Sequence, residues 1–229
     1  MDPKSSFDVL RAYVEAIASF TEEELAYLRT MFIPVTLGPG EFLQRAGEVA
    51  KYTGFVAVGC LRKYVIDATG KEHIISFAPE TWWVTDGLSL ASGTPSQYFI
   101  EAVEESDVLL IDAPSHEQIV QRVPGIAAAY RRGLQRAAAA RDERIARAMS
   151  GSARERYQEF LKTYPSIAAR VPQWMLASIS ALRQRPSAGF AKIFRDDDGV
   201  HRPSTLNLST GSARESAMAA QLVPAADIH

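Results

Sequence analysis

Apolar residues follow two different periods along the chain. Over residues 5–20 and 124–149 they recur every three to four positions, which places them on one face of a helix. Between these two segments, short β-branched and aromatic runs are separated by turns rich in glycine and proline, a pattern typical of β-strands. The pattern therefore predicts an α+β protein, in which a β module is followed by a long helix and a small helical module.

Several short segments in the first half are predicted to be β-strands. They are residues 32–37, 41–44, 54–58, 61–67, 73–77, 81–84, 98–103 and 108–111. Many short strands joined by closely spaced turns indicate a jelly roll, a sandwich or a barrel. Short helices are predicted on either side of the strands, over residues 22–29 and 115–122, and Thr21 with Glu24 matches a capping box.

The longest predicted element is a helix over residues 124–149. It begins with proline and is rich in Ala, Arg and Leu, which are strong helix formers. At 1.5 Å per residue it would be about 39 Å long, more than the usual three to four turns. We interpret it as a helix that connects two modules and pairs two chains in a homodimer; an ordinary core helix is the alternative. The predicted dimer face is Ile126, Tyr130, Leu134, Ala137, Arg141 and Ile145.

The chain after the long helix begins with regular structure and then loses it. Ser152 and Glu155 match a second capping box, which starts a predicted helix over residues 153–162, and another helix is predicted over residues 173–182. From Arg183 onward the apolar residues show no period, and proline, glycine and an acidic run interrupt them. The predicted divisions are a β module with its helices (1–123), a connecting helix (124–150), a small helical module (151–185), which the resemblance described below implies to be a partial helix-turn-helix, and a disordered tail (186–229).

The two halves of the chain differ in charge. Residues 1–125 hold 9 Lys and Arg against 18 Asp and Glu, a balance of −9, whereas residues 126–229 hold 16 against 9, a balance of +7. A basic module indicates an anionic partner, and nucleic acid is the commonest one. The alternative explanation is that the arginines are solvated on helix surfaces. We favour this alternative for the arginines of the long helix.

Composition also limits the cofactors and the compartment. The single cysteine, Cys60, excludes an intrachain disulfide and any all-cysteine metal site or cluster. His73 and His116 are isolated, so we expect neither a haem nor another metal site. No apolar run is long enough to span a membrane, and the first residues lack the apolar core of a signal peptide. We therefore expect a cytoplasmic protein with no membrane partner and no cofactor.

Short motifs occur in an order that resembles one known family. They are residues 36–41 (TLGPGE), 55–62 (FVAVGCLR), 67–72 (DATGKE), 93–96 (GTPS), 101–104 (EAVE), 109–112 (LLID) and the stretch from Ser152 to Ser178. Together they resemble the Crp/Fnr family of bacterial transcription regulators over about residues 20–182. The resemblance implies a cyclic-nucleotide-binding-type jelly roll, a long dimer helix and a winged helix-turn-helix that binds double-stranded DNA in response to a small-molecule effector.

The effector site departs from the pattern of the family members that bind cyclic AMP. Those members use a Gly-Glu pair at the start of a short helix for the ribose, and an Arg-x-x-(Ser/Thr) set for the phosphate. The corresponding positions here read Asp86-Gly87 and, over residues 96–99, SQYF. Because a guanidinium is suited to bind a phosphate with two hydrogen bonds, its absence predicts that cyclic AMP does not bind.

A pocket for another effector is still expected at the same place, although its aromatic residues could instead simply fill the roll. Its candidate residues are Trp83, Asp86, Gly87, Leu88, Ser89, Ser96, Gln97 and Tyr98. An unknown small molecule, or none, would occupy it. An enzyme is not expected, because His73 and the acidic turn at 104–107 show no arrangement of nucleophile and base.

The DNA-binding module departs from the family at its centre. The helix over residues 173–182 would be the first of the helix-turn-helix, but the chain continues with ISALRQRP (179–186), without the Leu-Gly-(Ile/Val)-(Thr/Ser) turn of the family. Pro186 would also break a recognition helix near its start. We therefore predict impaired specific DNA binding, and we interpret the abrupt change as a shift of reading frame or a sequencing error. Translation of the coding DNA in the two other frames tests that hypothesis.

Phosphate contacts are still expected from basic residues of this module, because they need no recognition helix. The candidates are Arg154, Arg156, Arg170, Arg183 and Arg185. The alternative function is an effector-sensing or protein-interaction module that does not bind DNA specifically.

Overall fold

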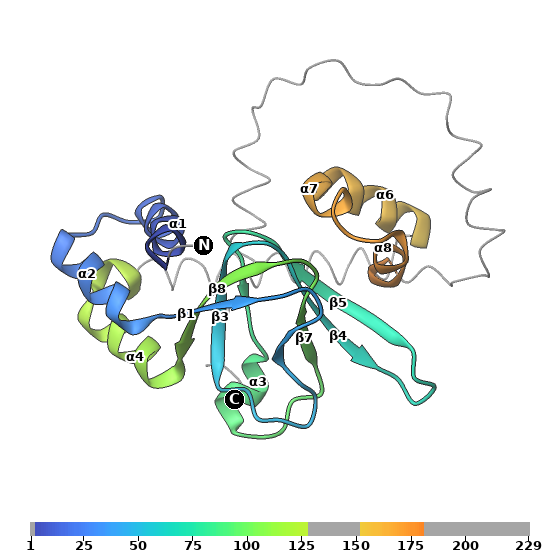
Figure 1. The fold of residues 1–229 in the computed structure, drawn as a ribbon, viewed down its shortest axis with the longest axis horizontal. Coiled ribbons are helices and arrows are strands. Elements are labelled where there is room, and N and C mark those ends of the chain that lie inside the picture. Colours follow the sequence, from blue (N-terminus) through green and yellow to red (C-terminus); the bar gives the residue numbers. More distant parts are fainter. Residues whose placement is uncertain (1–2, 128–151, 181–229) are drawn as a thin grey trace, which may run out of the picture.

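The structure is a computed structural model that describes residues 3–127 and 152–180 (Figure 1). Residues 124–127 are helical, so the start of the predicted long helix is present, and Ile126 packs against the N-terminal helices. The other predictions for that helix, the tail and the last two arginines lie outside the described residues. These predictions concern Tyr130, Leu134, Ala137, Arg141, Ile145, Arg183, Arg185 and residues 186–229.

Every predicted strand has a counterpart whose boundaries agree within two residues. The strands are β1 (Ile33–Leu37), β2 (Phe42–Gln44), β3 (Tyr52–Val58), β4 (Leu61–Ile66), β5 (Glu72–Ala78), β6 (Trp83–Val84), β7 (Phe99–Ala102) and β8 (Ser106–Asp112). The helices are α1 (Pro3–Glu15), α2 (Glu22–Met31), α3 (Gly87–Ser92), α4 (Ala113–Arg122), α6 (Ala153–Thr163), α7 (Pro165–Ala168) and α8 (Gln173–Ile179).

The strands form two antiparallel sheets, with orders β1-β8-β3-β6 and β2-β7-β4-β5. Non-consecutive strands are neighbours in both sheets, as in a jelly roll, which confirms the predicted α+β class. An apolar core drawn from both sheets includes Val56, Leu61, Ile100 and Val108, all of them buried. Burial of such side chains stabilises the roll by roughly 1.5–3 kcal/mol each.

Helices cover opposite sides of the roll (Figure 1). The helices α1, α2 and α4 pack together against the sheet β1-β8-β3-β6, where Leu10, Phe55 and Ile111 are buried in one cluster. The helices α6, α7 and α8 lie at the other sheet, where Tyr157, Ile167 and other apolar residues pack against β4 and β5. The small helical module and the roll therefore share an apolar interface.

Local signals explain most helix boundaries, and a few boundaries differ from the prediction. Both predicted capping boxes are formed, at Thr21 and at Ser152. The helix α1 ends at Glu15, earlier than its apolar period indicated. The helix α8 ends at Ile179, where the hydroxyl of Ser180 donates to the Leu176 carbonyl and accompanies the end of the helix. The short helix α7 was not predicted.

Among residues 3–127 and 152–180, no helix is both long enough and apolar enough to cross a bilayer.

Candidate effector cavity and helical module

A cavity of about 490 Å³ opens between β2, the turn before β3, and the start of α3. Its lining residues are Leu43, Gln44, Glu48, Val49, Lys51, Tyr52, Asp86 and Ile100. The volume lies within the range of small-molecule sites, and the lining mixes apolar side chains with a few polar groups. This cavity is therefore the candidate effector site.

Asp86 is the first residue of the Asp86-Gly87 pair, which stands in place of the Gly-Glu pair expected from the family resemblance. It is buried, and its carboxylate accepts a hydrogen bond from the Ser89 backbone N–H at 3.4 Å, so that it caps the N-terminus of α3. Gly87 is the first residue of α3. Asp86 thus caps the helix α3 and lines the cavity at the same time.

Lys63 lies close to Asp86 and was not singled out from the sequence. Its ammonium donates to the Thr85 carbonyl at 2.9 Å and lies 4.0 Å from the centre of the Tyr98 ring. Burial lowers the pKa of Lys63, although the nearby Asp86 carboxylate acts in the opposite direction. A lysine inside the otherwise largely apolar run LRKYVI was the signal available in the sequence.

The polar groups of the lining are mostly hydrogen-bond acceptors. Gln44 is buried, and its amide nitrogen donates to the carbonyls of Arg45 and Glu48, at 2.8 and 3.1 Å. Both N–H donors of that amide are thereby used, which leaves its oxygen as an acceptor. Glu48 and Asp86 add two carboxylates, whereas Lys51 supplies the one cation of the lining. Among the lining residues, a cyclic phosphate would meet two carboxylates and one ammonium.

The predicted pocket residues near α3 are distributed over several environments. Ser89 is buried and bonds to the Thr94 carbonyl and the Ala50 N–H, so it holds the loop around α3. Leu88 is exposed at 54%. Trp83 packs against Phe55 with ring centres 5.0 Å apart, on the side covered by α1. The structure brings Asp86 to the cavity but directs Trp83 into the N-terminal cluster.

The other three predicted pocket residues form a turn before β7. The Ser96 hydroxyl is buried and bonds to the N–H and the carbonyl of Tyr98. The Gln97 amide donates to the Tyr98 hydroxyl at 3.1 Å. The Tyr98 ring lies against the Lys63 ammonium, so this turn positions a side chain that contacts Lys63. A direct role of these residues in effector binding stays a prediction.

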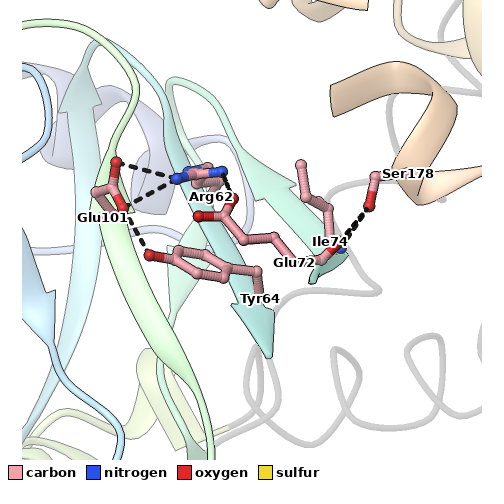
Figure 2. A network of polar contacts seen from close by, with 6 residues as sticks. All are labelled: Arg62, Tyr64, Glu72, Ile74, Glu101 and Ser178. Carbon is pink, nitrogen blue, oxygen red and sulfur yellow. Dashed lines mark hydrogen bonds and ion pairs between the residues drawn. The ribbon is translucent and has the colours of Figure 1, made fainter. Parts of the chain in front are cut away.

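A second polar centre lies on β4, in the motif FVAVGCLR. Arg62 pairs with Glu72 at 2.5 Å and with both carboxylate oxygens of Glu101, at 3.2 and 3.1 Å; Figure 2 shows these contacts. The Tyr64 hydroxyl also donates to Glu101 at 2.8 Å. The Arg62 side chain is only 7% exposed, so this network replaces water around a buried charge.

The helical module contacts the roll beside this network. The Ser178 hydroxyl accepts from the Ile74 N–H at 3.0 Å and donates to the Glu72 carbonyl at 3.3 Å (Figure 2). Trp174 lies over Arg62, with 5.3 Å between the guanidinium carbon and the ring centre. The helix α8 is therefore bound to β5, the edge strand of its sheet.

The predicted phosphate-binding arginines differ in what they contact. Arg170 forms two bonds to Glu80, at 2.6 and 3.1 Å, and an ion pair with Glu104 at 3.3 Å. Arg156 donates to the Ser180 carbonyl at 3.4 Å. Arg154 lies in the first turn of α6. In this arrangement Arg170 is engaged by carboxylates of the roll, and contacts to DNA stay a prediction for all of these residues.

The residues considered for catalysis or metal binding do not converge. His73 and Asp67 pair at 2.6 Å on the exposed hairpin between β4 and β5, whereas Glu104 faces Arg170. Among the residues that the structure describes, no group of three His, Cys, Asp or Glu side chains is placed to hold a metal ion.

Comparisons with known proteins agree with this geometry. Residues 34–123 match the family described as the cyclic nucleotide-binding domain. The catabolite activator protein of Thermus thermophilus is similar in structure, with a TM-score of 0.50 and 17% identity over 74% of this chain and 80% of that chain. The sensor domain of the transcriptional regulator DNR from Pseudomonas aeruginosa gives a TM-score of 0.46 and 19% identity, over 55% of this chain and 84% of that chain. No curated protein sequence matches the chain.

The roll and this match define the class of the first module: residues 34–123 form a cyclic nucleotide-binding domain. Within that class, the resemblance to the Crp/Fnr regulators is confirmed in this domain and in the fold that the chain shares with catabolite activator protein. At 17% identity, the structural likeness concerns the fold alone.

Proposed function

We propose that the protein is a cytoplasmic, homodimeric transcription regulator of the Crp/Fnr type, which senses an effector in its jelly roll and binds double-stranded DNA. The fold shared with catabolite activator protein carries the proposal, because it covers 74% of the chain and so extends beyond residues 34–123. The basic charge of the second half supports an anionic partner. The protein is proposed to sense and bind, not to catalyse a reaction.

The effector is proposed to lack a cyclic phosphate. Two carboxylates and one ammonium line the cavity, and no arginine is among its lining residues. A phosphate needs cationic or N–H donors, whereas this lining offers mainly acceptors. A ligand that carries hydrogen-bond donors suits the cavity better than cyclic AMP.

Specific DNA binding is proposed to be weakened in this chain. The sequence after Ser178 lacks the turn and the recognition helix of the family, and base readout in helix-turn-helix proteins comes from that second helix. The arginines of the module can still contact phosphates, which give affinity without sequence preference.

A gel shift in moderate salt tests this function. The probes are a duplex that carries a two-fold symmetric promoter site and a scrambled duplex of equal composition. We expect binding that weakens steeply with salt and a preference of about tenfold for the symmetric site, far below the thousandfold or more of intact regulators. The preference would come from residual base contacts and DNA shape in the two half-sites, because phosphates have the same spacing in both duplexes.

The alternative is an effector-sensing or protein-interaction module without specific DNA binding, and the residues after Ser178 favour it. Equal affinity for the two duplexes at every salt concentration would support this alternative and contradict the proposed function. A sedimentation measurement on the same sample provides the control, since a monomer would engage one half-site at a time and show a weaker preference even with intact DNA-binding modules.

A further inference from the structure

The helical module of residues 152–180 is held on the roll by three kinds of contact. Apolar residues of α6, α7 and α8 share one cluster with the roll, in which Ile167 and Leu176 pack with Tyr64 and Phe77. An ion pair joins Arg170 to the roll, and hydrogen bonds join Ser178 to β5. These contacts fix the orientation of α8, the first helix of the predicted helix-turn-helix.

The ion pair connects the module to the turn between β3 and β4. Glu80 accepts two bonds from Arg170 and one from the Gly59 N–H at 3.1 Å. Arg170 is nevertheless incompletely satisfied, because its Nε is buried and has no hydrogen-bond partner. A buried donor without an acceptor raises the free energy of the docked state, so the contact is specific but suboptimal.

The contact of Ser178 with β5 is also specific but suboptimal. As the edge strand of its sheet, β5 presents unpaired backbone groups on one side. One hydroxyl, rather than a further strand, satisfies the Ile74 N–H and the Glu72 carbonyl (Figure 2). Release of α8 would exchange these two side-chain bonds for bonds to water and would leave the ladder between β4 and β5 intact.

The strand β4 lies between the docked module and the cavity. Successive side chains of a strand point to opposite faces. Accordingly, Arg62 lies under Trp174 of α8, whereas Lys63 bonds to the Thr85 carbonyl next to Asp86 of the cavity. The neighbouring residues Lys63 and Arg62 of β4 therefore contact the two sides, Lys63 next to the cavity and Arg62 next to the module.

We propose that residues 152–180 form a releasable latch on the sensor domain, and that β4 couples this latch to the cavity through Lys63 and Arg62. The inference deepens the proposed function, because it names the regulation of its sensory site. It does not require that the module reads DNA.

The accessibility of the single cysteine of the chain, Cys60, measures whether the latch is docked. Cys60 has no exposed surface and lies in the apolar cluster shared with α6, α7 and α8. Burial raises the pKa of its thiol to about 12, although Arg170 acts in the opposite direction. In the docked state the thiol is inaccessible and protonated, so its reaction with a disulfide reagent requires that this shared cluster open.

The test measures the reaction rate of Cys60 with the aromatic disulfide DTNB in the full chain under native conditions. We expect Glu80→Gln and Arg170→Gln each to raise the rate about tenfold, since each removes a charge-assisted pair. The amide oxygen introduced by Glu80→Gln can still accept from the Gly59 N–H, so the turn between β3 and β4 keeps that bond. Because both variants break the same contact, the double variant is expected to react within about twofold of either single variant. Glu22→Gln breaks a similar ion pair, with Arg11, far from the latch, and is the matched control.

Two outcomes would overturn the proposal. Rates for Glu80→Gln and Arg170→Gln that equal the Glu22→Gln rate would overturn the latch. If either variant melts non-cooperatively, Ser178→Ala, which removes one hydroxyl, takes its place with the same expectation. Lys63→Met is expected to change the rate at least threefold without touching the module, and an unchanged rate would overturn the coupling through β4. None of these rates depends on DNA, so failure of the latch and failure of the proposed function are distinguishable.

Discussion

Replacing Arg62 with methionine is expected to lower the free energy of unfolding by about 3 kcal/mol. The guanidinium holds Glu72 at 2.5 Å and Glu101 at 3.1 Å, and its side chain is 7% exposed. Methionine fills a similar volume but leaves both carboxylates without their cation. Most of the loss in stability is expected from Glu101, because its side chain is only 14% exposed and water reaches it poorly. The Glu72 side chain is 31% exposed, so water can partly solvate its carboxylate.

Urea unfolding followed by tryptophan fluorescence measures this change. A second variant that combines Arg62→Met with Glu101→Gln is expected to recover part of the loss, because the stranded charge is removed. A loss below about 1 kcal/mol for Arg62→Met would place this pair with weak surface ion pairs and contradict the interpretation.

Replacing Gly59 with alanine is expected to cost about 3 kcal/mol or more, because the backbone and its surroundings both exclude a side chain. The φ angle of Gly59 is +91°, and an added Cβ would lie 2.3 Å from the Ser106 hydroxyl and 2.6 Å from the Glu105 carbonyl. The Ser106 Cα would also be only 2.7 Å away, so relief requires a movement of β8.

Gly70→Ala is the matched control for this prediction. Gly70 has a similar φ of +82°, but nothing lies within 4 Å of an added Cβ. We expect about 1 kcal/mol for the strained backbone alone. Equal losses for the two variants in thermal or urea unfolding would show that close packing around Gly59 contributes little.

The local elements of this protein could be predicted because their signals are local. The strands carry β-branched residues between glycine and proline turns, and the capping boxes at Thr21 and Ser152 need only residues three positions apart. The short helix α7 is not predicted because a proline usually marks the end of a helix, whereas Pro165 is the first residue of α7.

The site was less predictable because it depends on long-range contacts. Asp86 was found from a motif, but Gln44 and Lys51 join it in the cavity only through the crossing of strands. Arg170 was predicted to face DNA, yet Glu80 and Glu104 hold it in this arrangement. No pattern along the chain specifies that a residue of α8 will bond to the edge of β5.

The central claim is that the roll senses a ligand other than a cyclic phosphate, and thermal unfolding with cyclic AMP tests it most directly. At about 1 mM cyclic AMP we predict a melting temperature within about 1 °C of the ligand-free protein. An ordinary site, with a Kd one hundred times below the ligand concentration, would add about 2.7 kcal/mol and raise the melting temperature by roughly 5–10 °C. A rise of that size would contradict the claim that Asp86 and the missing arginine exclude the cyclic phosphate.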